Sequence, residues 1–557
     1  MNYRALSKRA GNAVRLAEVV RVLVRHGFSD LLRRLGLYEG IPAKVLRPIV
    51  HIQPPENVPH TMGQRMCSVF TELGPTFVKL GQLLSTRPDL VGKDMSDALG
   101  ALQDRVAPAP FDEVRVGLER DLGRTIDTCF PEFDTTPVAA GSISQVYKAR
   151  LSDGTRVAVK VRRPNIQAVI DSDLRLLRSI ADWTAEHVQD LAWLDPRAMV
   201  EEFARTLQRE MDFAIEALVI ERFSRNYTGS PHVVVPRVYH AFSTHHVLTM
   251  DWVDGVRIDA LDQYPARGSD PKVVARIGGD TLCRQIFDFR LFHGDPHPGN
   301  IMLTTDNRIT FLDYGMVGHL ELGDVRAIAT LLRAMYREDA GEAAGALLQF
   351  TTAGDTEHAE AFRHEVAEYM AFEAQAIVSK AEFGKAIERL VNILRRYGLQ
   401  LAPRFSLLLK AMMTIESTAH RLDPELDMTH VMRPHVERIV ARRLRPDRLL
   451  REAGVRAEML LTTIGEFPHE LLHLMHMVRR GQIRIHLHHE KLNQFAAVTD
   501  RASNRITFGV ITGSIIVGSS LLLAADVGLR WLGLTGYSLA GLLGLGLLVS
   551  ILRSKNF

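Results

Sequence analysis

Apolar residues recur three and four positions apart through the first part of the chain. Residues 10–36 interleave valines and leucines with arginines at this spacing, which predicts a basic amphipathic helix. Packing against neighbouring helices explains such a helix better than attachment to a membrane surface does. The helical pattern continues over residues 61–105. The chain is therefore expected to begin with a helical region.

The pattern changes to that of strands over residues 137–161, which are rich in β-branched residues. Turn-forming residues at 152–155 divide this stretch into two runs and predict a hairpin. Beyond it, the expected elements are helices over 165–227, strands over 232–253, short strands at 301–305 and 309–314, and helices over most of the chain after 271. A small sheet is thus expected between two helical regions.

Two uncharged apolar runs stand near the C-terminus, at residues 506–525 and 531–552. Each is about as long as a bilayer requires, and the glycines spread through them suit close packing of two helices. Basic residues flank both ends of the pair, which places those ends in the cytoplasm by the positive-inside tendency. We therefore predict a transmembrane hairpin, which would make this a multi-pass protein of the inner (cytoplasmic) membrane with its catalytic part in the cytoplasm.

Composition narrows the choice of function. A length of 557 residues favours about two or three structural units. The formal net charge of +3, with 24% charged residues, does not favour nucleic acid as a partner. The three cysteines lie far apart without paired spacing, which argues against a disulfide framework or a cysteine zinc site. The first residues lack the long apolar core of a secretory signal, so none is expected.

The segment HGDPHPGN, residues 293–300, holds an acid and an amide in a loop that its prolines and glycines keep from forming a helix. Taken alone it could be a polar surface turn. Thirteen residues after Asn300, however, an apolar strand ends in Asp313-Tyr-Gly. Asn300 and Asp313 offer the oxygen ligands that Mg²⁺ prefers, and Asp295 is left to orient or deprotonate an attacking hydroxyl or water. The pattern is typical of phosphoryl transfer from a nucleotide.

Lys160 stands in a β-branched run, Ala-Val-Lys-Val, which follows the small-residue turn at residues 139–144. A lysine in a strand is usually only a solvated edge residue. Here its position, some 135 residues before the loop, is that of a lysine that contacts the α- and β-phosphates. The order of lysine, loop and Asp313 therefore predicts that ATP and Mg²⁺ are the cofactors.

Six motifs together resemble those of the UbiB (AarF-type) family of atypical protein-kinase-like proteins: LGPTFVKLGQLLSTRPDL, AAGSISQVYKA, VAVKV, EMDFAIEA, HGDPHPGN and LDYG. The Lys-x-Gly-Gln segment within the first is not a general kinase feature. The resemblance implies an α+β, two-lobed protein-kinase-like fold with an N-terminal helical extension and a C-terminal transmembrane helical hairpin. The implied domains are the extension at 1–130, an N-lobe at 131–255, a C-lobe at 256–430, a helical juxtamembrane region at 431–505 and the hairpin at 506–552.

The resemblance also implies a role for each matching residue. It makes Asp295, Lys160 and Glu216 catalytic, with Glu216 paired to Lys160, and Asn300 and Asp313 metal ligands. It assigns the nucleotide to Ala139, Ala140, Gly141, Ser142, Val146, Lys160 and Met250. It gives regulatory roles to Lys79, Gln82, Glu210 and Asp212, with Lys79 on a helix over the nucleotide and Glu210 as its partner.

Some features depart from the usual patterns. Gly141 stands within the alanine-rich run and Ser144 where a glycine is common, which bears on loop rigidity and nucleotide preference. Ordinary protein kinases carry a lysine two residues after the catalytic aspartate, and here that position is His297. No Ala-Pro-Glu segment follows Asp313, so a platform for peptide substrates is not expected. Residues 469–473, HELLH, match a zinc-protease signature, but an interfacial helix explains them better.

The function implied is that of a membrane-anchored atypical kinase or ATPase that supports isoprenoid-quinone (ubiquinone) biosynthesis. Membrane lipids are the expected partners, with quinone-biosynthesis enzymes or lipid intermediates as further candidates and a homodimer left open. Two alternatives stay open. One is a small-molecule phosphotransferase of the aminoglycoside or choline kinase type, which shares the HGDxxxxN pattern. The other is a nucleotide-gated lipid-binding scaffold.

Overall fold

A computed structural model describes residues 10–30, 61–102, 106–188, 195–352, 359–374, 383–443, 492–524 and 530–553. The chain forms two compact units, Met1–Leu449 and Leu450–Phe557. The HELLH segment at 469–473 lies outside the described residues.

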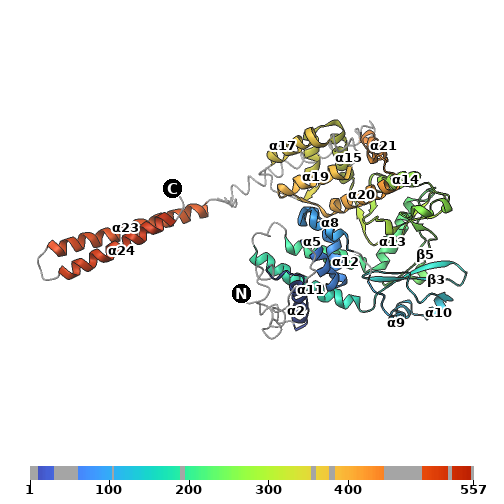
Figure 1. Cartoon of the computed structure of the whole chain (residues 1–557), viewed down its shortest axis with the longest axis horizontal. Coiled ribbons are helices and arrows are strands. Elements are labelled where there is room, and N and C mark those ends of the chain that lie inside the picture. Colours follow the sequence, from blue (N-terminus) through green and yellow to red (C-terminus); the bar gives the residue numbers. More distant parts are fainter. Residues whose placement is uncertain are drawn as a thin grey trace, which may run out of the picture. The chain divides into compact units, whose positions relative to one another are not determined.

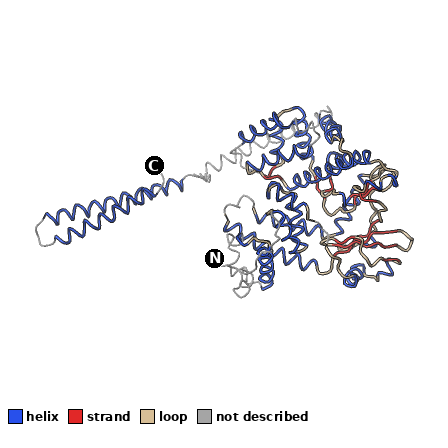
Figure 2. Tube along the Cα trace, in the orientation of Figure 1, coloured by secondary structure: helices blue, strands red, loops and turns tan. Residues whose placement is uncertain are grey.

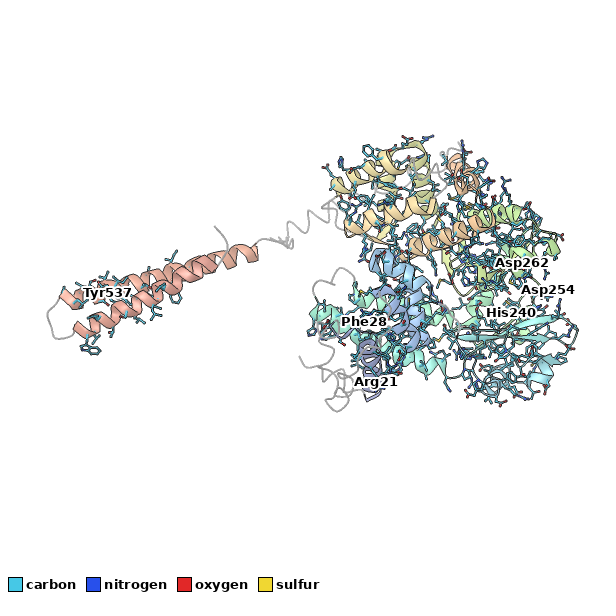
Figure 3. All side chains as sticks on the ribbon, viewed as in Figure 1. Arg21, Phe28, His240, Asp254, Asp262 and Tyr537 are labelled. Carbon is cyan, nitrogen blue, oxygen red and sulfur yellow. The ribbon has the colours of Figure 1, made fainter. Side chains whose placement is uncertain are left out.

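A helical layer in the first unit is built from two separate segments of the chain (Figure 1). The earlier segment supplies α2 (Ala10–Arg25), α5 (Met62–Leu73), α6 (Pro75–Ser85), α7 (Pro88–Val91) and α8 (Lys93–Gly100). The later one supplies α11 (Ile166–His187) and α12 (Pro196–Glu210). One apolar core joins both segments, and the Arg65 guanidinium lies 4.5 Å from the centre of the Phe28 ring, which Figure 3 labels. The helix predicted from residue 10 ends early, at Arg25, because Gly27 adopts a φ of 79°.

An antiparallel sheet follows the order β1-β3-β4-β5, with β2 paired to β3. Its strands are β1 (Glu132–Phe133), β2 (Ala139–Ala140), β3 (Ser144–Arg150), β4 (Arg156–Arg162) and β5 (Val247–Asp251). The helices α9 (Phe111–Leu122) and α10 (Ile126–Cys129) cover one face, and Val157, Val159 and Val161 are buried in that core. Because side chains alternate along a strand, Lys160 belongs to the opposite face.

The strand prediction for residues 232–253 was only partly right. The second half forms β5, whereas Val233 and Val238 make isolated bridges outside any strand. Pro236 stands between them and has no N–H to donate to a ladder. Helix α13 (Phe213–Asn226) precedes this stretch and packs against β5.

The rest of the first unit is mainly helical, as Figure 2 shows. Its helices are α14 (Pro271–Arg284), α15 (Leu322–Arg337), α16 (Ala340–Leu348), α17 (Ala359–Tyr369), α19 (Phe383–Arg396), α20 (Pro403–Leu422) and α21 (Met428–Arg443). Short strands make three small sheets: β6 (Val256–Arg257), β8 (Ile301–Leu303) and β9 (Ile309–Phe311); β7 (Leu291–His293) and β10 (Val317–His319); β11 (Thr351–Thr352) and β12 (Gln400–Leu401). The segment at 293–300 runs from the last residue of β7 to a short 3-10 turn at Pro298–Asn300 directly before β8, and it forms no α-helix, as its prolines and glycines predicted.

The described part of the second unit is a helical hairpin of α23 (Leu492–Ala524) and α24 (Arg530–Arg553) (Figure 1). Across the pair, the Ser520 hydroxyl hydrogen-bonds the hydroxyl of Tyr537, which Figure 3 labels. Within the described residues, no helix is both long enough and apolar enough to cross a membrane. The two predicted helices are thus present, but the prediction that they span a membrane is not supported.

Candidate active site

A cavity of about 1430 Å³ lies within the first unit and is lined by residues from several of its elements. Side chains reach it from α6 and α8, from the β2–β3 hairpin, from β4 and the end of β5, from the loop at 293–300, from the segment at 312–316 and from α20. This volume exceeds the range of about 300–1,000 Å³ usual for small-molecule sites. The cavity therefore has room for a nucleotide and a second reactant.

Lys160 lines the cavity and links the sheet to α13 and to the segment that carries Asp313. Its Nζ lies 2.8 Å from both carboxylate oxygens of Glu216 on α13 and 3.2 Å from Oδ1 of Asp313. Glu216 is only 3% exposed, and its Oε1 also accepts the Tyr314 N–H at 3.3 Å. The sheet, α13 and the segment that carries Asp313 are thus held together by one network, in which Glu216 is buried and the Asp313 side chain is half-exposed.

The network sets the charges at the site. Burial works against a charge on Lys160, but the carboxylates of Asp313 and Glu216 outweigh it and raise the pKa of the ammonium group. Burial alone would raise the pKa of Asp313, yet the charges of Lys160 and Lys79 and the Gly315 N–H lower it below its ordinary value. Asp313 is therefore held as a carboxylate, the form that binds a cation.

His293 ties the loop at 293–300 to the Asp313 segment. Its Nε2 is hydrogen-bonded to the Asp313 carbonyl oxygen, while its Nδ1 accepts the Asp295 N–H at 3.2 Å. The acceptor role of Nδ1 requires the neutral ring with the proton on Nε2. Burial favours this form, because it lowers the pKa of His293. Asp295 and Asp313 are thus positioned by opposite sides of a single imidazole.

Asn300 and Asp313 fit a magnesium site. The Asn300 side-chain amide donates to the Asp295 carbonyl at 3.1 Å, which leaves its oxygen as an acceptor. The Asn300 carbonyl accepts the Leu312 N–H at 3.0 Å, so the two ligand-bearing segments lie side by side. Both side chains line the cavity. The described part of the chain holds no cluster of three His, Cys, Asp or Glu side chains suited to a metal, and phosphate oxygens commonly complete a magnesium shell.

The alanine-rich turn covers the cavity as the end of a hairpin. Ala139 pairs with Val146 in the ladder, and the Gly141 N–H donates to the Ser144 carbonyl at 2.8 Å. Arg163 fixes the turn from outside through a 2.7 Å bond to the Gly141 carbonyl. Ala139, Ala140, Gly141, Val146 and Met250 all line the cavity.

Ser142, in the same turn, is 0% exposed and does not line the cavity. Its predicted contact with the nucleotide stays a prediction.

The Lys-x-Gly-Gln segment lies on α6, at the wall of the cavity opposite the sheet. Lys79 Nζ is 3.0 Å from Oε2 of Glu210, and Lys79, Gln82 and Glu210 all line the cavity. Gly81 is needed for packing, because a Cβ there would clash with the side chains of Leu102 and Phe70. The structure thus brings the predicted Lys79–Glu210 pair together beside the nucleotide residues.

Asp212 does not reach the cavity. It caps α13 by accepting the Ala214 N–H at 3.0 Å, and the same oxygen lies 2.8 Å from Nδ1 of His245. Its place in the structure is that of a helix cap, two residues beyond Glu210. The regulatory role of Asp212 stays a prediction.

Comparison with known proteins agrees with this geometry. Residues 101–346 match the ABC1 atypical kinase-like domain, 375–427 the UbiB helical domain and 490–553 the ABC1/UbiB kinase-like C-terminal domain. A probable protein kinase UbiB of Xylella fastidiosa is 32% identical over 524 residues, which cover 92% of this chain and 93% of the relative. The chain belongs to the UbiB family of atypical kinase-like proteins.

Other relatives span the same length. A probable protein kinase UbiB of Sodalis glossinidius is 28% identical and covers 92% of this chain and 94% of its own. An uncharacterized protein in the hydrogenase 1 5′ region of Clostridium pasteurianum is 29% identical, and the match covers 97% of this chain and 99% of that protein. A solved structure, titled the complex of Rv3197 with erythromycin from Mycobacterium tuberculosis, is 22% identical with a TM-score of 0.45, and covers 65% of this chain and 92% of that one.

The site of this UbiB-family chain also contains a residue that the motifs did not identify. Lys410 on α20 lies with its Nζ 3.0 Å from Oδ1 of Asp295. Its one signal in the sequence is that it is the single charged residue between Arg404 and Glu416, in an otherwise apolar and hydroxyl-bearing helix. The same pattern is expected of a surface lysine whose stem packs on the helix while its ammonium group stays in water. The sequence alone therefore did not place Lys410 at the site.

Proposed function

We propose that this chain binds Mg-ATP in the cavity and hydrolyses it, or transfers its γ-phosphoryl group, at a membrane surface in support of isoprenoid-quinone (ubiquinone) biosynthesis. The observation that carries the proposal is the Lys160–Glu216–Asp313 network beside Asp295 and Asn300. In kinase-like sites these residue types hold the phosphates, the metal and the attacking oxygen.

Each residue has a distinct part in the proposed reaction. Lys160, kept charged by its carboxylates, binds the α- and β-phosphates. Asn300 and Asp313 would hold Mg²⁺, which when bound neutralises charge on the phosphates. Asp295 accepts the proton of the attacking water or hydroxyl. His293 keeps the two aspartates in their relative places through its two ring nitrogens.

The far half of the cavity supports transfer to an acceptor as well as hydrolysis. Beyond the nucleotide residues it is lined by α20, with Met413, Thr414 and Ser417 among its residues. A hydroxylated acceptor with an apolar body matches the methionine and hydroxyl groups of this wall, to which Lys410 and Arg421 on the same helix add positive charge. Hydrolysis and transfer then differ only in whether water or that acceptor faces Asp295.

The exposed apolar surface of the α23–α24 hairpin supports the membrane part of the proposal. Among its residues Phe508, Val517, Trp531, Leu534 and Leu542 are all more than half exposed. A surface of this kind usually marks a lipid or protein contact. The quinone part of the proposal is supported by the family, whose relatives carry the name UbiB.

The test of the proposed function is phosphate release from Mg-ATP by the full chain, with and without vesicles of anionic lipid. We expect release that vesicles increase and that falls by about three orders of magnitude in Asp313→Asn, since a metal ligand is lost. Nucleotide binding, measured separately by calorimetry, confirms that the variant is folded. No release and no binding by the wild-type chain would refute the proposal.

Two further measurements separate the proposal from its alternatives. Deletion of the gene should lower the cellular quinone pool, and a normal pool would contradict the biosynthetic role. Asp295→Asn should fail to complement the deletion because the reaction needs its carboxylate, whereas a nucleotide-gated scaffold would still complement. A soluble alcohol that stimulates turnover many-fold without lipid would favour a small-molecule kinase instead.

A further inference from the structure

Lys410 reaches the catalytic loop from a part of the chain more than a hundred residues away. Its Nζ lies 3.0 Å from Oδ1 of Asp295 and it lines the cavity together with Asp295, Asn300 and Asp313. Its presence beside Asp295 lowers the pKa of that carboxyl against the opposing effect of burial. Lys410 therefore contributes a positive charge directly beside Asp295, the residue proposed to accept the proton of the attacking group.

The helix that carries Lys410 is docked directly on this loop. Leu407, one turn before Lys410, approaches Gly294 so closely that a Cβ on the glycine would lie 2.9 Å from its Cδ1. Met316 closes the other side of Gly294, where the same Cβ would lie 3.0 Å from its Cγ. Because residues three apart share a helix face, the contact of Leu407 fixes Lys410 over Asp295.

His297 does not offer the same fixed cation, although it occupies the position where ordinary protein kinases have a lysine. Its Nδ1 accepts the Gly299 N–H at 3.0 Å, so that nitrogen carries no proton. Its Nε2 lies 3.9 Å from Oδ2 of Asp295, beyond hydrogen-bond distance. The ammonium group of Lys410 is thus the cation that hydrogen-bonds the side chain of Asp295 in this structure.

We propose that Lys410 is a catalytic residue that binds the transferring γ-phosphoryl group, supplied by the helical domain in place of a catalytic-loop lysine. This inference rests on the proposed function and deepens it. An ammonium group has three donors, so it can keep its bond to Asp295 while a second N–H points at a phosphoryl oxygen.

The chemistry of transfer explains what such a cation does. The bond between the γ-phosphorus and the bridging oxygen breaks, and its electron pair stays on the β-phosphate of ADP. A bond from water or an acceptor hydroxyl to the phosphorus forms, and the proton of that group goes to Asp295. In the transition state, charge is spread over the three oxygens of the transferring group, so a fixed ammonium group beside them lowers the barrier.

The test compares Lys410→Ala and Lys410→Arg with Arg404→Ala, a variant of the same helix. Arg404 pairs with Asp324 at 3.0 Å and is not a lining residue, so it reports on the helix alone. We expect Lys410→Ala to lower kcat about 100-fold, as loss of one transition-state donor does, with KM for Mg-ATP within about threefold. Lys410→Arg should recover at least a tenth of wild-type kcat, because it keeps a charged donor. Arg404→Ala should keep wild-type kcat even where its Tm falls.

A second readout does not depend on turnover. If Lys410 contacts the γ-phosphoryl group, the wild-type chain should bind Mg-ATP more tightly than Mg-ADP, and Lys410→Ala should reduce this preference at least fivefold. An unchanged preference together with unchanged kcat would overturn the proposal. A rise in kcat for Lys410→Ala would also overturn it, because Lys410 would then inhibit the reaction by holding Asp295 in an ion pair.

The two readouts also separate this inference from the proposed function. A wild-type chain that binds Mg-ATP but turns nothing over would refute the proposed reaction, while the nucleotide preference would still test the contact of Lys410. A chain that binds no nucleotide would refute both.

Discussion

Two lysine–glutamate pairs face the same cavity from different regions, and they differ in how they reach Asp313. Lys160, from the sheet, bonds both Glu216 and Asp313 directly. Lys79, from the helical layer, bonds Glu210 at 3.0 Å and influences Asp313 only through space. Both lysines are almost equally shielded, at 13% and 14% exposure. The two pairs therefore differ in their bonds and not in their burial: Lys160 bonds Asp313, whereas Lys79 acts on it through its charge.

The comparison is tested most strongly by removing one glutamate charge at a time. Glu216→Gln should lower kcat for Mg-ATP turnover on the order of 100-fold, because Lys160 loses the buried carboxylate that orients it. The matched variant Glu210→Gln should change kcat less than about fivefold, because Lys79 acts on Asp313 only through its charge. Equal losses in the two variants would show that the helical layer is as much a part of the reaction as the sheet.

The packing of the helical layer can be tested at Gly81. Gly81→Ala should lower the free energy of unfolding by about 1–3 kcal/mol, since the new methyl group would overlap the side chains of Leu102 and Phe70. Denaturant unfolding measures the loss. Gly117→Ala is the control, because a Cβ at that helical position meets nothing within 4 Å. An unchanged free energy of unfolding for Gly81→Ala would mean that the side chains of Leu102 and Phe70 can move aside at little cost.

A smaller and different effect is expected at Lys79. Lys79→Ala removes a positive charge that acts on Asp313 without bonding it, so the site should remain assembled while nucleotide selectivity or autophosphorylation changes. Competition between ATP and ADP for binding, together with phosphate incorporation into the chain, measures both. Behaviour identical to wild type in the two assays would contradict a regulatory role for this pair.

The smallest expected effect is a pH dependence at His293. Burial lowers the pKa of His293 below its ordinary value of 6.5, so below that pH the unfolded chain binds a proton that the folded chain does not. Stability is therefore lost as the pH falls below 6.5 and is unaffected by this group above it. The stability difference between wild type and His293→Asn should shrink on acidification, by at most about 1.4 kcal/mol per pH unit. A difference that stays constant from pH 7.5 to 5.5 would contradict this account.

Much of the site was accessible from the sequence because its chemistry lies in short, ordered motifs. Lys160 in a β-branched strand and Asp295, Asn300 and Asp313 in two turn-bounded segments were identified by residue type and order alone. The structure gathers all four around one cavity. The β3–β4 hairpin followed equally from alternation and a turn signal.

Contacts between distant segments were decided only by the tertiary structure. Lys410 sits beside Asp295 because Leu407 docks α20 on Gly294, a packing event with no local trace in the sequence. The hairpin turn buries Ser142, and the cap of α13 holds Asp212 away from the cavity, although both stood within recognised motifs.

The physical reason is the range over which each signal acts. Periodicity, turn chemistry and motif spacing express interactions between neighbours in the chain, so the sequence by itself determined the elements and the reactive residue types. Which side chains face each other across the cavity depends on how buried surfaces close-pack, and only the folded chain decides that.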